Sequence, residues 1–210
     1  MKKHFLFYLA RAFFAVLFVY EVLNWLGILH YSLEFTWLGL VLTSGLVWLA
    51  CELVMKKFSH DEMPSSVQGL AFLGAAAPVY ADALADMNRW YGSISHFDKY
   101  LHFLGGVAAA GLVILIVSTL AKRKKPEFTV SNNWVAWISF LIALALGVLY
   151  EFEEYLEDVF TGSSRSGGSA DTASDLLFDA IGAALVVVTV WLVWKSKKTR
   201  KKSSGAKKAA

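Results

Sequence analysis

The sequence is poor in charged residues and in cysteine. Only 18% of its 210 residues are charged, whereas about a quarter are charged in an ordinary soluble domain. Hydrophobic residues make up 57% of the chain, and the mean hydropathy is +0.50. These values exclude a typical soluble protein. The single cysteine, Cys51, excludes an intrachain disulfide, so cysteine usage does not indicate a cellular compartment.

Long apolar runs take the place of the missing charge. A hydrocarbon core about 30 Å thick requires about 20 mostly apolar residues per helix. We therefore predict an all-α, polytopic transmembrane bundle. Its six spans are expected at residues 5–29, 34–55, 67–86, 98–121, 134–157 and 173–194.

Two of these spans have an alternative reading. The first follows Met1-Lys2-Lys3, as a signal peptide would, but it is too long for one and has no clear cleavage site. The third is short, is rich in Ala and Gly, and contains Pro78, so it could be a re-entrant segment. We expect one transmembrane domain over residues 1–194, followed by a basic disordered tail over residues 195–210.

Basic residues are distributed very unevenly between the two sides of the predicted bundle. Seventeen of the 20 Lys and Arg residues fall on the side of the termini, and only Arg89, Lys99 and Arg165 fall on the other. Basic and weakly basic segments alternate at every loop along the chain, and a re-entrant third segment would break this alternation. The positive-inside rule then predicts a plasma (inner) membrane protein with both termini in the cytoplasm.

Acidic residues show the opposite distribution. Thirteen of the 17 Asp and Glu residues lie toward the predicted outer side, although the positive-inside rule makes no demand on acids. Within helices, residues three or four positions apart share a face. This spacing places three acidic or acid–histidine stripes at helix ends: Asp98 with His102; Glu151, Glu154 and Asp158; and Asp171, Asp175 and Asp179. Glu153 and Glu157 fall on a different face of their helix.

Ionisable groups at membrane depth cost several kcal/mol each, so they normally pair or mark a functional site. Adjacent carboxylates need a cation, a shared proton or a base, and the three nearby bases are too few. Carboxylates with one imidazole suit divalent ions such as Mg²⁺, Mn²⁺, Fe²⁺ or Zn²⁺. We predict a metal site formed by His102, Asp98, Glu151, Glu154, Asp175 and Asp179. The wider pocket is expected to include Asp82, Asp86, Asp158, Asp171, Lys99 and Arg165.

Purely structural roles are also open for these residues. Thr172 and Asp175 fit a capping box at the start of the last helix. Glu153, Glu157 and Asp158 would be a solvated helix end. Asp82 and Asp86 would mark only the membrane interface, and His102 would donate one hydrogen bond across the bundle.

The chain resembles the VanZ-like membrane proteins and, more strongly, the YjdF-like group of bacterial inner-membrane proteins. The matching motifs cover roughly residues 65–185: Ala81 to Asp86 with Trp90-Tyr91, Asp98 to Gly106, Gly147 with Glu151 and Glu154, and Asp171 to Ala183 with its spaced aspartates. VanZ-like proteins tend to carry Gln near Glu154 and Asn near Asp179, so this chain is more acidic. The resemblance implies a multi-span helical fold. VanZ itself is associated with glycopeptide resistance at the cell envelope.

Three functions remain open from the sequence. The first is divalent-metal-dependent hydrolysis or transfer on a lipid or lipid-linked phosphate at the outer leaflet, with a free carboxylate or His102 as base. The second is cation or proton transport, for which only Glu21 and Glu52 continue the polar path inward. The third is a non-catalytic accessory subunit. The expected partners are membrane lipid and a lipid-linked substrate, without nucleic acid.

Overall fold

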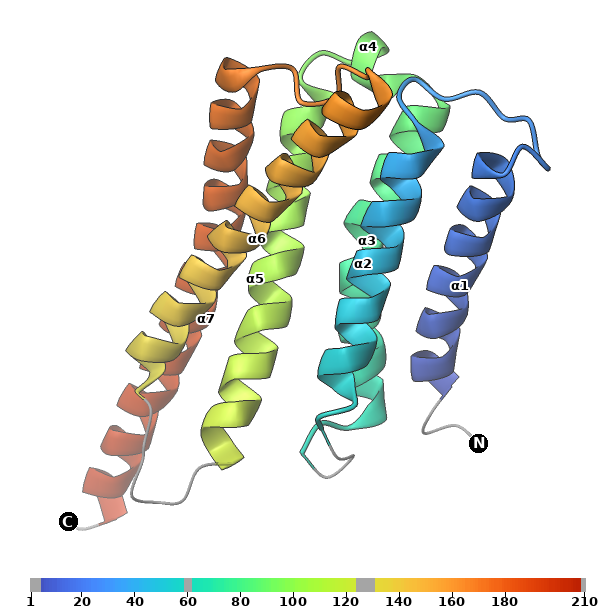
Figure 1. Ribbon diagram of the computed structural model, residues 1–210. Coiled ribbons are helices and arrows are strands. Elements are labelled where there is room, and N and C mark those ends of the chain that lie inside the picture. Colours follow the sequence, from blue (N-terminus) through green and yellow to red (C-terminus); the bar gives the residue numbers. More distant parts are fainter. Residues whose placement is uncertain (1–4, 59–61, 124–130, 209–210) are drawn as a thin grey trace.

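Six long helices run side by side in the structure, and a single-turn helix lies across one end of the bundle (Figure 1). The computed structural model describes residues 5–58, 62–123 and 131–208, of which 122–123 and 198–208 are described by their backbone alone. These ranges contain helices and no strands. The helices are α1 (Phe5–Trp25), α2 (Trp37–Met55), α3 (Ser65–Met87), α4 (Trp90–Ser93), α5 (Phe97–Arg123), α6 (Asn132–Thr161) and α7 (Ser169–Lys208).

All the long helices are apolar enough to cross a membrane, which confirms the predicted polytopic bundle. α3 is a continuous 23-residue helix that contains Pro78, so the third segment is a full-length span rather than a re-entrant one. α1 begins and α7 finishes at the same end of the bundle, and α4 lies at the opposite end, called the α4 end below (Figure 1). Several charged residues counted in the sequence analysis of the two sides lie outside the described residues: Lys2, Lys3, Asp61, Lys124, Lys125 and Glu127.

Local backbone chemistry sets the ends of the helices. α1 ends four residues before the predicted boundary because Gly27 adopts a left-handed conformation (φ 69°), which only glycine tolerates well. α2 begins after Thr36, whose hydroxyl accepts a hydrogen bond from the amide of Gly39. α6 ends at Thr161, and the next residue, Gly162, again has positive φ. α7 continues into residues 195–208, for which the sequence analysis expects disorder.

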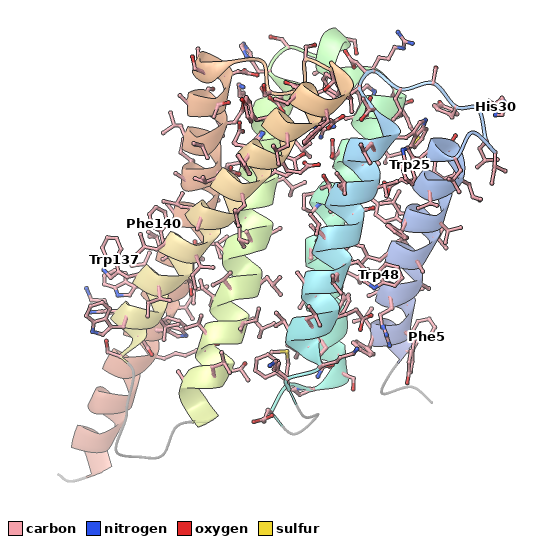
Figure 2. The ribbon with its side chains drawn as sticks, in the orientation of Figure 1. Phe5, Trp25, His30, Trp48, Trp137 and Phe140 are labelled. Carbon is pink, nitrogen blue, oxygen red and sulfur yellow. The ribbon has the colours of Figure 1, made fainter. Side chains whose placement is uncertain are left out.

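The helices form two groups of three. α1, α2 and α3 share an apolar core that contains the fully buried side chains of Phe14 and Phe72. Trp48 stacks on Phe14 at a ring distance of 6.5 Å and lies between α1 and α2 (Figure 2). α5, α6 and α7 pack through small buried residues, among them Ala110 and Ala183. α3 packs against α5 and joins the two groups.

Two glycines allow α5 and α7 to approach closely. A Cβ atom at Gly106 would overlap the backbone carbonyl of Asp179, and one at Gly182 would overlap the carbonyl of Phe103. Small residues at helix contacts are common in membrane bundles, because they let two backbones approach closely. The contact fixes the register between α5 and α7, and with it the positions of the polar residues that these helices carry.

Candidate functional site

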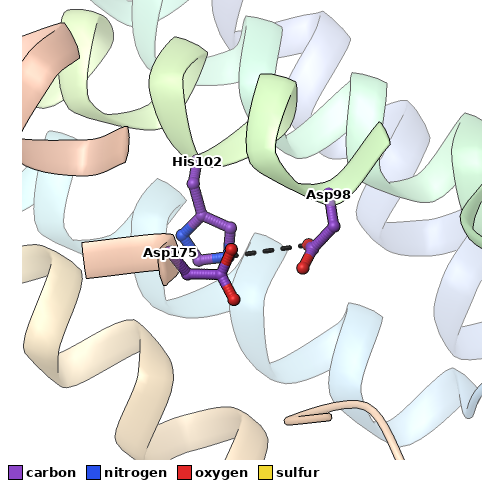
Figure 3. A group of neighbouring side chains, drawn as sticks. All are labelled: Asp98, His102 and Asp175. Carbon is purple, nitrogen blue, oxygen red and sulfur yellow. Dashed lines mark ion pairs between the residues drawn. The ribbon is translucent and has the colours of Figure 1, made fainter. Parts of the chain in front are cut away.

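His102 is surrounded by carboxylates near the start of α5, at the α4 end, and only 3% of its surface is exposed. Its Nε2 atom lies 3.5 Å from Glu151, 3.6 Å from Asp98 and 3.9 Å from Asp175. Its Nδ1 atom lies 3.3 Å from the carboxylate of Asp179. Figure 3 shows the carboxylates of Asp98 and Asp175 beside the His102 ring. The stripes predicted on α5, α6 and α7 therefore converge.

The two ring nitrogens of His102 have different surroundings. Nδ1 is hydrogen bonded to Asp179, whereas Nε2 is buried without a hydrogen-bond partner among the described residues. The carboxylate of Glu151 lies beside the hydroxyl of Thr172, but neither of its oxygens has a hydrogen bond of ordinary geometry. Buried polar atoms without partners are rare and costly in folded proteins. An unsatisfied imidazole nitrogen and an unsatisfied carboxylate therefore face each other.

These atoms are close enough together to hold a metal ion. One ligand atom each from Asp98, His102 and Asp175 lies within 4.8 Å of the others, and the same is true of His102, Glu151 and Glu154. His102 belongs to both groups. The residues come from α5, α6 and α7, so an ion at this place would join all three helices.

Lys99 neutralises part of the surrounding negative charge. Its Nζ lies 2.5 Å from Asp171, 2.6 Å from Asp175 and 3.4 Å from Asp98. Because Asp175 also lies next to His102, one carboxylate connects the lysine and the imidazole. The lysine ties the first turn of α5 to the first turns of α7.

Space for the carboxylate of Asp179 comes from a glycine on α6. A Cβ atom at Gly147 would collide with this carboxylate, so the glycine leaves the room in which Asp179 reaches the His102 ring. Gly147 and the Gly106–Asp179 contact thus both serve the same side chain. The position of Asp179 depends on the packing of all three helices.

A second cluster forms around Arg165, which lies in the loop between α6 and α7. Its side chain is only 2% exposed. The guanidinium donates to Asp82 (2.7 Å), to Glu154 (3.0 Å) and to the hydroxyl of Tyr150 (2.8 Å). The arginine therefore connects α3 with α6, and its loop reaches back into the bundle.

Two aromatic residues cover the guanidinium of Arg165. The rings of Phe35 and Tyr91 lie 5.4 and 5.8 Å from it, and the Tyr91 hydroxyl donates to Asp82 over 2.5 Å. Burial alone would lower the pKa of Arg165, but the charge of Asp82 and its neighbours outweighs it, so the pKa is raised and the arginine stays charged. Burial and Asp82 also raise the pKa of Tyr91 well above its ordinary value, so the phenol remains a neutral donor.

Asp158 holds the loop that carries Arg165. Its carboxylate accepts hydrogen bonds from the amides of Arg165 (2.7 Å) and Ser166 (3.0 Å) and from the hydroxyls of Ser163 and Ser166. Asp86 plays a similar role for the loop between α1 and α2. It accepts from the amide of Phe35 over 2.8 Å and so positions the ring that covers Arg165.

A cavity of about 300 Å³ connects the two clusters at the α4 end. Lys99 and Asp98 line it from the His102 cluster, and Arg165 lines it from the other. The Nη1 atom of Arg165 has no hydrogen-bond partner among the described residues. Besides these two cations, three carboxylates line the cavity, from Glu34, Asp98 and Asp171. The rest of the lining consists of ring-bearing and small residues: Phe35, Tyr91, His96, Phe97, Gly92, Ser164 and Gly167.

Most residues predicted for the site lie at one of these two places. Of the six proposed metal ligands, His102 is at the centre of the first cluster and four carboxylates surround it. The sixth, Glu154, lies between the imidazole and Arg165. Of the wider set, Lys99 and Asp171 join the His102 cluster, and Asp82 and Arg165 form the second one. Asp86 and Asp158 hold loops and do not line the cavity.

Some structural alternatives were wrong. Glu157 is not at a solvated helix end, because it is 3% exposed and accepts a hydrogen bond from Thr36, the residue that caps α2. Glu153 likewise accepts from Thr43 over 3.2 Å. The capping box of Thr172 with Asp175 also fails, because α7 begins earlier, at Ser169, and Asp175 binds Lys99 instead.

Sequence reasoning missed the two tyrosines of the Arg165 cluster and the cavity residue Glu34. Tyr91 belongs to a motif noted in the sequence, but it was assigned no role. Tyr150 immediately precedes Glu151, and its position next to a run of acids was the available signal. No pattern in the sequence indicates that Glu34 lines the cavity, because it lies in an irregular loop.

Comparison with known families agrees with the fold. The family described as "Predicted membrane protein (DUF2238)" matches residues 5–196, which include five candidate spans in full and all but the last residue of the sixth. The chain belongs to this family. No curated protein and no solved structure shows a significant match. As a DUF2238 protein the chain is an integral, multi-pass membrane protein, and the family description adds no activity.

Proposed function

We propose that this membrane protein binds a divalent cation at His102 and uses it in hydrolysis or transfer on a lipid or lipid-linked phosphate. The observation that carries the proposal is the buried Nε2 atom of His102, which has no hydrogen-bond partner yet faces three carboxylates at 3.5–3.9 Å. Those separations are too long for good hydrogen bonds. Tetrahedral ligands about 2.1 Å from a metal lie about 3.4 Å apart, which is close to the observed spacing.

The hydrogen bond on the other ring nitrogen supports the same reading. Histidines that bind metal usually donate their second N–H to a carboxylate, which fixes the tautomer and the ring orientation. Asp179 is placed to do this at Nδ1. We therefore assign Asp179 to orienting the ring, and Asp98, Glu151 and Asp175 to the ion, with Glu154 within reach.

The cavity beside this cluster is where a substrate would enter. A bound divalent ion would polarise a phosphoryl oxygen. Asp98 lines both the cavity and the His102 cluster, and Lys99 and Arg165 contribute positive charge to the walls. The base that we favour is a carboxylate that the ion leaves free. We propose that this end faces the outer leaflet of the plasma membrane, because most basic residues of the chain belong to the other end.

Cation or proton transport is the second candidate, because buried polar contacts continue along α2. Glu153 meets Thr43, and Glu21, which is fully buried on α1, accepts a hydrogen bond from the adjacent Ser44. The path leads from the α4 end toward the middle of the bundle. The metal proposal has priority because the His102 cluster presents both unsatisfied ligand atoms and suitable spacing.

Thermal unfolding of the full-length protein in detergent tests the cation site. A chelator should lower Tm, and one of Mg²⁺, Mn²⁺ or Zn²⁺ should restore it, because a ligand that binds only the folded state stabilises it. At a free ion concentration about 100 times Kd the stabilisation is about 2.7 kcal/mol. His102→Ala should abolish the response, and Asp179→Asn should weaken ion binding by about 10- to 100-fold.

A matched control is Glu52→Gln, which removes a carboxylate that pairs with Arg11 at the far end of the bundle. This variant should keep the full response to chelator and ion. If wild-type protein shows no response to the chelator and contains no stoichiometric metal by elemental analysis, the cation site is wrong. The acids would then share protons among themselves.

A further inference from the structure

The cavity at the α4 end is lined by two residues that each keep a buried polar atom without a partner. Among the residues that the structure describes, Nη1 of Arg165 is a donor without an acceptor, and Oε2 of Glu34 is an acceptor without a donor. An unpaired buried polar group costs the full desolvation of that group, so such groups normally find a partner. A ligand that satisfies both atoms must carry an acceptor and a donor.

The orientation of Arg165 leaves Nη1 available to the cavity. The Nε and Nη2 atoms form one edge of the planar guanidinium, and they donate to Glu154 and Asp82. Nη1 lies on the other edge. The rings of Phe35 and Tyr91 cover the guanidinium, and both rings line the cavity. Nη1 is therefore the nitrogen that an acceptor bound in the cavity can reach.

The carboxylate of Glu34 lies against Gly92 of α4, at the wall of the cavity. A Cβ atom on Gly92 would come within 2.6 Å of Oε1 of Glu34, and Gly92 itself lines the cavity. The other two acids of the lining, Asp98 and Asp171, are paired with Lys99. Glu34 is therefore the acid of the lining that is left to bind a cation.

The charges of the lining favour a ligand without net charge. Lys99 is less available than Arg165, because its contacts with Asp98, Asp171 and Asp175 already use the three donors of an ammonium group. Three carboxylates face two cations around the cavity, so a ligand with net negative charge is repelled. A zwitterion leaves the balance of charge unchanged and still offers one group to each unpartnered atom.

The cavity lies where the head groups of lipids lie. Its walls come largely from the α1–α2 loop, from α4 and from the α6–α7 loop, all at one end of the bundle (Figure 1). Loops that join membrane spans lie at the membrane surface. The volume of about 300 Å³ is at the lower end of the range for small-molecule sites, so the cavity can hold a head group but not the acyl chains of a lipid.

We propose that the cavity binds a zwitterionic group that carries a phosphate and a primary ammonium, as a phosphoethanolamine head group does. A phosphate oxygen accepts from Nη1 of Arg165, and the ammonium donates to Oε2 of Glu34. A primary ammonium has three donors, whereas a trimethylated one has none, so Glu34 distinguishes the two. The inference rests on the proposed function for this group being part of a substrate, but its binding requires no metal.

Native mass spectrometry of the full-length protein, with a chelator present, tests the proposal with three lipids that share the same acyl chains. Phosphatidylethanolamine carries both groups, phosphatidylcholine has no donor on nitrogen, and phosphatidylglycerol has no nitrogen. Wild-type protein should retain phosphatidylethanolamine about tenfold more strongly than either of the others, because a hydrogen bond to a charged group contributes about this factor. Equal retention of phosphatidylethanolamine and phosphatidylcholine, or strongest retention of phosphatidylglycerol, would overturn the proposal.

Soluble phosphoethanolamine distinguishes a lipid from a soluble ligand of the same chemistry. If it displaces phosphatidylethanolamine at an equal concentration, the natural ligand is a soluble zwitterion. If a large excess is needed, the ligand is the lipid, whose chains add to the affinity. Failure of phosphoethanolamine to displace the lipid at any concentration would overturn the assignment to this cavity.

Two variants test the ammonium contact. Glu34→Gln should lower the preference for phosphatidylethanolamine over phosphatidylcholine several-fold, because charge-assisted hydrogen bonds are about twice as strong as neutral ones. Gly92→Ala should do the same, since its Cβ atom must displace the Glu34 carboxylate. The matched controls are Glu52→Gln, at the far end of the bundle, and Gly74→Ala, where an added Cβ meets nothing within 4 Å. An unchanged preference in Glu34→Gln, or an equal loss in the controls, would contradict the proposal.

This inference and the cation site can fail separately. His102→Ala should lose the response of Tm to divalent ions and keep the preference for phosphatidylethanolamine. Wild-type protein that responds to ions but shows no head-group preference would refute this inference alone. A preference in wild-type protein that contains no metal and does not respond to ions would refute the cation site and support this inference.

Discussion

Arg165 shows that a loop residue can be buried within a helical bundle, because its side chain is only 2% exposed. Its guanidinium is charged, fully enclosed and bound by Asp82 and Glu154, and its loop is held by Asp158. Removing one partner of a buried ion pair leaves the other charge uncompensated, which costs far more than the pair contributes on balance. The stability of the α4 end should therefore depend strongly on this residue.

Arg165→Gln should lower the free energy of unfolding by about 3–5 kcal/mol, because Asp82 and Glu154 would remain buried without a cation. Tryptophan fluorescence during thermal unfolding in detergent would measure the change. Arg89→Gln, an exposed arginine at the same end of the bundle, is the control and should shift Tm little.

A double variant keeps this test informative. Adding Asp82→Asn to Arg165→Gln removes one of the stranded charges, so part of the lost stability should return. If the double variant is no more stable than the single one, the loss arises from packing of the arginine side chain and not from its charge.

At the residue scale, the sequence predicts which side chains matter better than what each one contacts. The i, i+3 and i+4 spacing places His102, Glu151 and Asp179 on the inward faces of their helices, and they do meet. The same reasoning assigns Glu157 to solvent, and it is buried against Thr36. Spacing identifies a face of a helix, but it cannot say which neighbour that face meets.

Among the elements, the α5–α7 contact controls the geometry around His102. Gly106 sits directly against the backbone of Asp179, so a side chain there must push α7 away. Displacing α7 would move Asp175 and Asp179 away from the imidazole together. The contact therefore couples helix packing to the candidate ion site.

Gly106→Ala should destabilise the protein by about 1–3 kcal/mol, because the added methyl group overpacks the contact. It should also weaken the response of Tm to divalent ions. Gly111→Ala lies on the same helix, where an added Cβ meets nothing within 4 Å, and it should be neutral or stabilising by up to about 1 kcal/mol. If both substitutions have the same effect on ion binding, the contact does not set the site.

Helices were the most predictable elements, and their connections were the least. Apolar length identifies each of the spans, including α3 with its internal Pro78. Short-range backbone chemistry decides the rest: Gly27 ends α1 earlier than hydropathy suggests. α4 went unpredicted because a single turn carries no apolar period.

At the scale of the whole molecule, charge separates the two ends of the bundle. The His102 and Arg165 clusters occupy the α4 end, and α1 begins and α7 ends at the other (Figure 1). Hydropathy and the alternation of basic and non-basic loops could predict this arrangement, because they identify whole spans and the end of the bundle to which each loop belongs. They could not predict that the helices form two groups joined by α3 and α5, since that depends on which faces interlock.

The predicted orientation has a direct test. Cysteines introduced as Ser131→Cys and Ser203→Cys should be shielded from an impermeant thiol reagent in intact cells, whereas Ser164→Cys, at an exposed site in the α6–α7 loop, should react. Native Cys51 is buried and should contribute little background. Labelling of Ser203→Cys from outside, without labelling of Ser164→Cys, would reverse the orientation.

Gly39 on α2 has a consequence for how sequences of this family can diverge. A Cβ atom there would overlap the carboxylate of Glu157, which reaches across from α6. A larger residue at position 39 would therefore require the Glu157 side chain to move or to be shorter. A family member with alanine or a larger residue at position 39 should carry a shorter side chain at position 157. Paired substitutions of this kind among related sequences would be evidence for the α2–α6 contact that does not depend on a structure.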